Sequence, residues 1–150
     1  MDALQQLIAC NALRDLKARY FYYLDTKDWD RWLALFTPDA TLKADWAPST
    51  RGRDGETAVE CSGVEEIRRK VAYGTLEPAQ TVHHGHTPIL EFTSPTTAEG
   101  IWAMEDVVLT AEGLSLHGFG HYHETYVKDS AGWRIRALHL TRLRMTLTRG

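Results

Sequence analysis

The sequence predicts an α+β fold in which a curved mixed or antiparallel sheet wraps around one long N-terminal helix to form a cone-shaped roll. Apolar residues recur every three or four positions over residues 2–24, which is the helical period. From Thr81 onward, β-branched and aromatic residues alternate with polar ones over residues 81–92, 97–111, 115–128 and 132–147, which is the strand period. Helices followed by a run of strands is the α+β order.

The boundaries of the helices follow from capping residues and helix breakers. Asp2 is a good N-cap for the first helix, and Asp28 is one for a short second helix over residues 28–36, which ends before Pro38. A third helix is predicted over residues 63–71. Residues 39–62 otherwise look irregular, with one short strand at 40–43 and a turn-rich loop at 47–55.

The chain has the length of a single domain, and we expect residues 1–150 to form one. No repeat, low-complexity segment or linker divides it. The breaks between the last strands are short, as in antiparallel hairpins. Gly118 and Gly120 stand where a strongly curved sheet needs small residues.

Composition argues against several classes of function. The net charge is −3, and the C-terminal arginines are spread out, so the basic patch of a nucleic-acid-binding protein is missing. No apolar run approaches the roughly 20 residues that cross a membrane, and the N-terminus does not resemble a signal peptide. We therefore expect a cytoplasmic protein. Two cysteines without a CxxC pair predict neither a disulfide framework nor a thiolate zinc site.

Aromatic residues are abundant, with five Trp, six Tyr and four Phe. Such side chains fill cores and also line pockets for flat, apolar ligands. The sequence contains no GxSxG elbow and no glycine-rich nucleotide loop. The expected partner is therefore a small hydrophobic molecule.

Three histidines in four residues, His83, His84 and His86, form the most distinctive cluster. Strand alternation places His84 and His86 on one face and His83 on the other. A metal site would need a further ligand from elsewhere, and hydrogen-bonded structural histidines are the simpler interpretation. We predict no metal.

Three other polar positions have two interpretations each. Asp25 either ends the first helix or serves as a carboxylate at the border of an apolar cavity. Asp106, in an apolar strand, faces either solvent or that cavity. In the segment after Gly118, Tyr122 and Glu124 share one face and His121 and His123 the other, but a single bulge would reverse which of them points inward.

The segment from Arg19 to Ala40, with its Asp25 and Asp28-Trp29-Asp30 pattern, resembles the opening of SnoaL-like proteins of the nuclear transport factor 2-like superfamily. The segments from Thr81 to Gly100 and from Gly118 to Ile135 are similar to later parts of the same family. The resemblance implies the cone-shaped fold. It leaves function open, because this fold hosts many activities.

Dehydratase members of the superfamily, the scytalone and bile acid 7α-dehydratases, imply roles for individual residues. Their catalytic aspartate falls on Asp25 and their histidine on His83, while a tyrosine of the bile acid enzymes falls on Tyr20. A later aspartate falls near Asp106, and a C-terminal arginine near Arg142 or Arg144. An aspartate that fixes the tautomer of an imidazole makes that imidazole a general base.

The resemblance therefore implies a cofactor-independent lyase or isomerase, with a catalytic set of Asp25, His83, Tyr20 and Asp106. A non-catalytic small-molecule-binding or accessory domain of the same fold is the alternative. A third interpretation is an oligomeric interaction module, such as a small β-subunit-like partner of an oxygenase. In all cases we expect a homo-oligomer, a dimer or trimer. The side chains expected to contact a bound molecule are Tyr122, Trp46, Trp102, Arg144 and His84.

Overall fold

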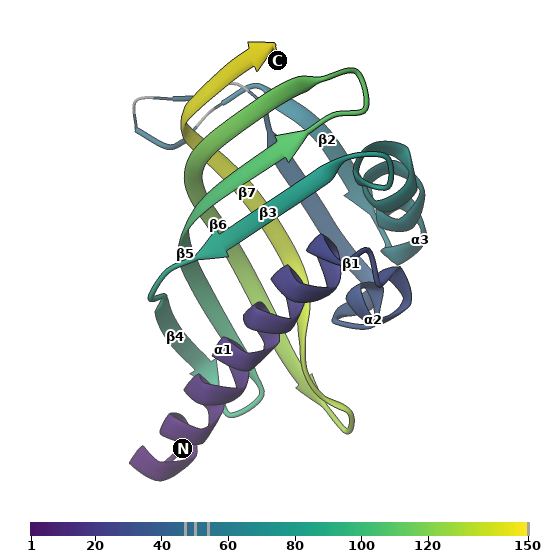
Figure 1. Cartoon of the computed structure of the whole chain (residues 1–150). Coiled ribbons are helices and arrows are strands. Elements are labelled where there is room, and N and C mark those ends of the chain that lie inside the picture. The colour runs from purple at the N-terminus through teal and green to yellow at the C-terminus, as the bar shows by residue number, and fades with distance from the viewer. Residues whose placement is uncertain (47, 50, 54, 150) are drawn as a thin grey trace.

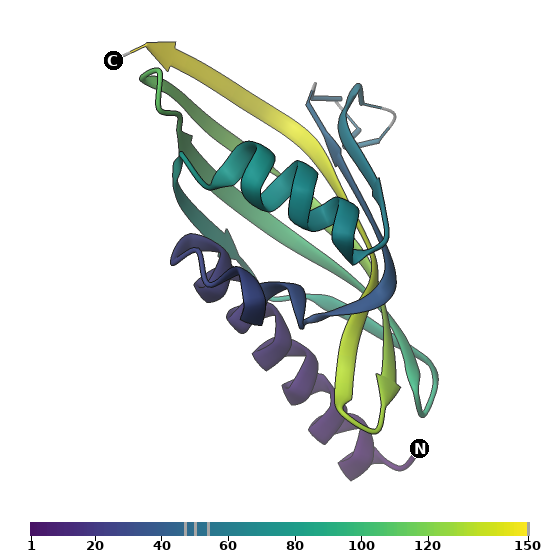
Figure 2. The same cartoon turned by 90° about the vertical axis from the view of Figure 1, so that its right-hand side faces the viewer.

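One long helix crosses the concave side of a strongly curved sheet (Figure 1). The computed structural model describes residues 1–46, 48–49, 51–53 and 55–149. The shorter helices lie on the same side of the sheet as the long one, so that the sheet and the helices enclose the core between them (Figure 2). The predicted α+β roll is therefore confirmed.

Helix α1 runs from Ala3 to Asp25 and begins at the predicted cap. The amide of Gln5 donates to the Asp2 carboxylate at 2.8 Å, and the Gln5 side chain accepts the Asp2 amide at 3.0 Å, so the two residues form a capping box. Toward its C-terminal end the helix buries one stripe, which delivers Asp25 to the core edge. The stripe consists of Leu13, Leu16, Lys17, Tyr20 and Leu24.

Helix α2 (Trp29–Leu33) is shorter than predicted, because β1 already begins at Phe36. Asp28 caps it as expected, accepting the amide of Arg31 at 3.4 Å.

The predicted third helix is longer than expected and changes type. A short α3 (Val64–Glu66) passes into a π-helix, η1 (Ile67–Leu76). The amide of Glu77 donates to the carbonyl of Ala72, five residues back, at 2.8 Å. The ammonium of Lys27 binds the carbonyl oxygen of Leu76 at 2.8 Å, which ties the end of this helix to the turn after α1.

In the described part of the chain, seven strands form one mixed sheet in the order β2-β1-β7-β6-β5-β3, with β4 also paired to β5. Only β1 and β7 run parallel among these pairs. The strands are β1 (Phe36–Asp45), β2 (Thr57–Ser62), β3 (Gln80–Gly85), β4 (Ile89–Ser94), β5 (Thr97–Leu109), β6 (Leu114–Asp129) and β7 (Gly132–Arg149).

Two predictions about strands were wrong. Strand β2 lies inside the segment expected to be irregular; it is an edge strand that buries only Cys61, so it carries little hydrophobic signal. The predicted strand 81–92 is two strands, because the chain leaves β3 at Gly85 and passes through Pro88, which has no amide to donate. The predicted loop 47–55 includes residues 47, 50 and 54, which lie outside the described residues.

A β-bulge between Phe119 and Gly120 bends the sheet at the predicted glycines. A Cβ atom on Gly120 would overlap the backbone carbonyl of Thr141 on β7. Gly120→Ala should therefore lower the free energy of unfolding by about 2 kcal/mol or more. Urea denaturation of the wild type and of Gly120→Ala measures this loss. A loss below about 0.5 kcal/mol, the range of an ordinary surface substitution, would contradict the prediction.

Candidate functional site

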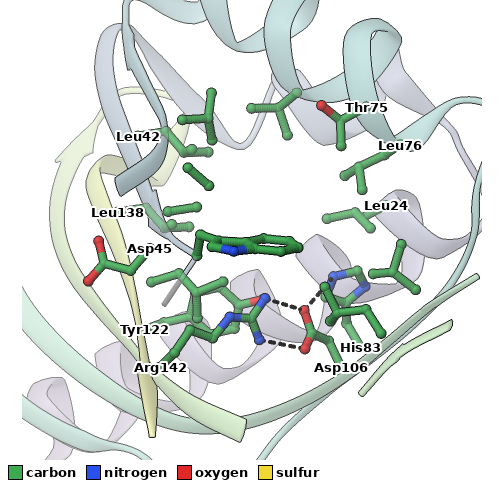
Figure 3. Close-up of a pocket in the computed structure, with 18 of the residues that line it drawn as sticks. Leu24, Leu42, Asp45, Thr75, Leu76, His83, Asp106, Tyr122, Leu138 and Arg142 are labelled. Carbon is green, nitrogen blue, oxygen red and sulfur yellow. Dashed lines mark hydrogen bonds and ion pairs between the residues drawn. The ribbon is translucent and has the colours of Figure 1, made fainter. Parts of the chain in front are cut away.

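A cavity of about 190 Å³ lies between the inner face of the sheet, the end of α1 and the π-helix. Leu42, Leu76 and Leu138 line one side of it, with Asp45 and Thr75 beside them. A polar cluster of His83, Asp106, Tyr122 and Arg142 lines the opposite side (Figure 3). The cavity therefore has an apolar wall that would accept rings or hydrocarbon and a polar wall that could carry chemistry. The polar lining residues are Tyr20, Asp45, Thr75, His83, Asp106, Tyr122 and Arg142.

The structure brings Asp25 and His83 together. The carboxylate of Asp25 lies 2.7 Å from His83 Nδ1 and also accepts the backbone amide of His83 at 2.8 Å and the Thr81 hydroxyl at 2.9 Å. Strand alternation buries Thr81 and His83 and exposes Val82 and His84. With Nδ1–H donated to the carboxylate, the lone pair of a neutral His83 is on Nε2.

His83 Nε2 points toward a second carboxylate, that of Asp106, at 3.9 Å (Figure 3). Asp106 forms a two-pronged ion pair with Arg142, with Nη1–Oδ1 and Nη2–Oδ2 distances of 2.6 and 2.9 Å. Both side chains are buried. Gly118 lies opposite, and a Cβ there would be 2.6 Å from Asp106 Oδ1 and would overlap Arg142. This glycine therefore leaves room for the ion pair.

The guanidinium of Arg142 has one N–H group, on Nε, that takes no part in the ion pair with Asp106. Its Nε–H is buried and has no hydrogen-bond partner among the described residues. A buried donor left unpaired is unfavourable by about 1–3 kcal/mol. A bound molecule with an acceptor atom at this position would remove that penalty.

Two tyrosines complete the polar wall. The rings of Tyr20, from α1, and Tyr122, from β6, lie 5.8 Å apart. Burial raises the pKa of both phenols well above the usual value, and nearby carboxylates add to the effect. Both hydroxyls therefore stay protonated and can act as hydrogen-bond donors.

The expected ligand contacts are only partly at the cavity. Trp46 lines it and is 43% exposed, and Tyr122 lies in its wall. Trp102 lies elsewhere in the core, donating its indole N–H to the Tyr126 hydroxyl at 2.7 Å. The side chain of His84 is exposed on the other face of β3. Alternation along β3 therefore turns His84 away from the cavity, whereas Trp102 shares the inward face of β5 with Asp106 but lies four residues away from it, outside the cavity lining.

Arg142, rather than Arg144, reaches the cavity. On a regular strand, residues two positions apart face the same way, so Arg142 and Arg144 would share one face of β7. However, Gly120 pairs with Arg142 and Phe119 with Arg144, so Leu143 is an extra, bulged residue. The bulge turns Arg144 to the exposed face. The sequence contains no signal for this bulge. It also contains none for the presence of Asp45 at the cavity, where the Asp45 carboxylate accepts a hydrogen bond from His139 at 3.0 Å.

A second buried ion pair lies behind the tyrosines. Lys17 Nζ is 3.1 Å from Glu124 Oε1, and the two side chains are 1% and 0% exposed. Glu124 also accepts the Tyr126 hydroxyl at 3.0 Å. Burial lowers the pKa of Lys17 from 10.5 to about 8, although Glu124 favours the charged form.

Between pH 8 and pH 10 the free energy of unfolding should rise with pH because of Lys17. In this range the unfolded chain holds the lysine proton and the folded chain has released it, so each increase in pH favours folding. The slope is at most about 1.4 kcal/mol per pH unit. Urea denaturation of the wild type and of Lys17→Met/Glu124→Gln isolates this effect. If the difference in free energy of unfolding between the wild type and the double variant does not change with pH, the prediction is wrong.

Neither a metal cluster nor a membrane-spanning helix is found in the described ranges. No three His, Cys, Asp or Glu side chains there converge as metal ligands would. No helix among those residues is both long and apolar enough to cross a bilayer.

Comparisons with known proteins agree with this architecture. Residues 5–139 match the SnoaL-like domain family. The probable cyclase FGR4 of Gibberella zeae is 27% identical over 132 residues, covering 85% of this chain and 86% of the cyclase. A hexachlorocyclohexane dehydrochlorinase, LinA type 2, superposes with a TM-score of 0.83 at 21% identity, covering 99% of this chain and 95% of its own.

A nuclear transport factor 2-like superfamily protein from Salmonella enterica has a TM-score of 0.71 at 18% identity and covers 93% of this chain and 91% of its own. At such identities the structural likeness shows a shared fold. The family match spans most of the chain and includes Asp25, His83 and Asp106. The chain thus belongs to the SnoaL-like domain family, and it shares its fold with a nuclear transport factor 2-like protein.

Proposed function

We propose that this protein is a cofactor-independent lyase or isomerase of the dehydratase type that acts on a small, hydrophobic, cyclic molecule. The observation that carries the proposal is that His83, whose Nδ1 is bonded to Asp25, lies in the polar wall of a largely apolar cavity. A named cyclase and a named dehydrochlorinase among the similar proteins are consistent with elimination or ring chemistry on this fold.

The first step is proton removal from a carbon next to a carbonyl group. His83 Nε2 accepts this proton while Nδ1–H stays bonded to Asp25, which stabilises the imidazolium that forms. The electron pair of the C–H bond moves toward the carbonyl oxygen and gives an enolate. The Tyr20 hydroxyl, kept protonated by burial, donates to that oxygen.

The second step expels the leaving group. The enolate pair forms a C=C bond as the bond to a β-hydroxyl group breaks. The departing oxygen takes the proton that His83 Nε2 accepted in the first step, so that it leaves as water and His83 returns to its neutral form. Arg142 supplies a buried donor, its Nε–H, for that oxygen. Asp106 holds the guanidinium in place through two hydrogen bonds. If no leaving group is present, return of the proton to another carbon gives isomerisation.

The proposal is tested with a panel of fused-ring β-hydroxyketones incubated with the protein in D₂O. At least one should gain deuterium at the α carbon or lose water to a conjugated enone, detected by mass and ultraviolet absorbance. Asp25→Asn should abolish both signals. Asp28→Asn, which changes the carboxylate that caps α2 to another residue able to cap a helix, is the matched control. Exchange that is equally fast in Asp25→Asn would refute the proposed base.

The second candidate is a non-catalytic small-molecule-binding or accessory domain, favoured by the mostly apolar cavity lining. Native mass spectrometry of protein from its host distinguishes the two. A retained molecule that is released unchanged after long incubation supports the binding domain, whereas conversion supports the enzyme.

Self-association is also proposed. Leu4, Leu7 and Ile8 on the first turns of α1 are each more than 60% exposed and share one helix face. A second copy of the chain would cover such a surface. Light scattering at micromolar concentration should give a dimer or trimer, and a monomer would contradict this.

A further inference from the structure

The buried Lys17–Glu124 ion pair is the most unusual feature that the proposed chemistry does not use. Lys17 stands on the inward stripe of α1, between Leu13 and Tyr20, where an apolar side chain would satisfy the helical period. Replacing a buried ion pair by apolar residues is often neutral or stabilising. Stability of the fold alone therefore does not explain why the pair is there.

The ammonium of Lys17 contacts the two tyrosines of the cavity wall from behind. Its Nζ lies 3.7 Å from the ring centroid of Tyr20 and 3.6 Å from that of Tyr122. Both rings line the cavity, whereas Lys17 does not. The Lys17 ammonium thus contacts the rings of both tyrosines whose hydroxyls could donate to a bound molecule. The two rings separate the ammonium from that molecule.

The carboxylate that holds the ammonium is itself fixed. Glu124 is bonded to Lys17 through both oxygens, at 3.1 and 3.2 Å, and it accepts the Tyr126 hydroxyl. Tyr126 in turn accepts the indole N–H of Trp102. Hydrogen bonds between side chains of β5 and β6 therefore hold the Lys17 ammonium in place against the two tyrosine rings.

A cation against the face of an aromatic ring is attracted by the ring's negative face. It also draws electron density out of the ring, which makes a phenol O–H a stronger donor. We infer that Lys17 is a positioning residue: its ammonium, held by Glu124, orients Tyr20 and Tyr122 and strengthens their hydroxyls as donors to an oxygen atom in the cavity. The inference rests on the proposed function, in which Tyr20 stabilises an enolate oxygen.

The test uses two probes of the same shape, 2-acetylnaphthalene and 2-isopropenylnaphthalene. They differ only in whether a carbonyl oxygen or a CH₂ group is presented, and neither changes its charge with pH. The ratio of their dissociation constants, measured by naphthyl fluorescence, reports the donor strength of the cavity wall. A change in the shape of the cavity would affect both probes and cancel in the ratio.

In the wild type the ketone should bind about tenfold more tightly than the hydrocarbon, which corresponds to one good hydrogen bond. Tyr20→Phe removes the Tyr20 hydroxyl and should reduce the preference for the ketone to about threefold or less. Lys17→Met/Glu124→Gln removes both charges together. Its ratio should fall to near that of Tyr20→Phe, while the affinity for the hydrocarbon stays within about threefold of wild type.

The outcomes separate the two proposals. If the double variant keeps the wild-type ratio while Tyr20→Phe lowers it, Lys17 has no positioning role and the proposed function stands. If Tyr20→Phe does not lower the ratio, Tyr20 is not a donor and its proposed role is wrong. If the double variant does not lower the ratio either, this inference is wrong as well, whereas a lower ratio in the double variant alone would leave Tyr122 as the donor that Lys17 strengthens.

The wild type alone provides a second measurement if the double variant does not fold. The pKa of Lys17 is lowered to about 8, so the ammonium loses its proton as the pH rises from 7 to 10. The groups that face it are Glu124, Tyr20 and Tyr122, and the raised pKa of each tyrosine keeps both neutral in this range. The ketone preference should decrease across this range. A constant ratio would overturn the inference.

Discussion

Replacing His83 with alanine should lower kcat for proton abstraction or elimination by about 10²–10⁴-fold, the range contributed by a positioned general base. The side chain of His83 lies at the cavity, with Nδ1 fixed by Asp25 at 2.7 Å and Nε2 directed toward Asp106. No other imidazole lines the cavity in the described part of the chain. Its loss leaves no group of suitable basicity in the same position.

The matched control is His84→Ala, one residue further along β3. The chemical change is the same, but the His84 side chain is exposed on the opposite face of the strand. Its kcat should stay within about twofold of wild type. Circular dichroism and urea denaturation check that both variants fold. A His83→Ala protein that keeps more than a tenth of wild-type kcat would exclude this histidine as the base.

Replacing Arg142 with methionine should lower the free energy of unfolding by about 3–5 kcal/mol, because it leaves the Asp106 carboxylate buried without its partner. Both side chains are almost completely buried and share two short hydrogen bonds. A loss of this size is a large fraction of the stability of a typical domain. Urea denaturation at neutral pH measures it.

Two further variants separate loss of the ion pair from loss of packing. Arg144→Met removes an exposed arginine two residues away on β7 and should change stability by less than about 0.5 kcal/mol. Arg142→Met/Asp106→Asn removes both charges and should recover part of the loss. An Arg144→Met protein as unstable as Arg142→Met would mean that the pair contributes nothing specific.

Local signals in the sequence were sufficient for the secondary structure that carries the site. The Asp2 capping box and the apolar period set the start of α1 and its inward stripe, and both depend only on residues a few positions apart. Alternation after Thr81 predicted the long strands and placed His83 and His84 on opposite faces, but it did not decide which of the two points inward. The exceptions were β2 and the break at Pro88, where an edge strand and a missing amide weaken the pattern.

The meeting of Asp25 with His83 could not be derived from spacing, because 58 positions separate the two residues. Similarity to a known family indicated it, and the contact itself depends on how α1 packs against β3. The choice between Arg142 and Arg144 depended on one bulged residue, Leu143, whose position is fixed by pairing with β6. No single-sequence pattern contains that register.

By itself, then, the sequence determined the helices, the long strands and the apolar stripe, because capping and periodicity act between near neighbours along the chain. Only the tertiary structure decided which polar groups meet at or below the surface of the core: Asp25 with His83, Asp106 with Arg142, and Lys17 with Glu124. The physical reason is that burying a charge is unfavourable unless a partner lies within hydrogen-bond distance. Such partners come from strands and helices that meet only in the folded chain.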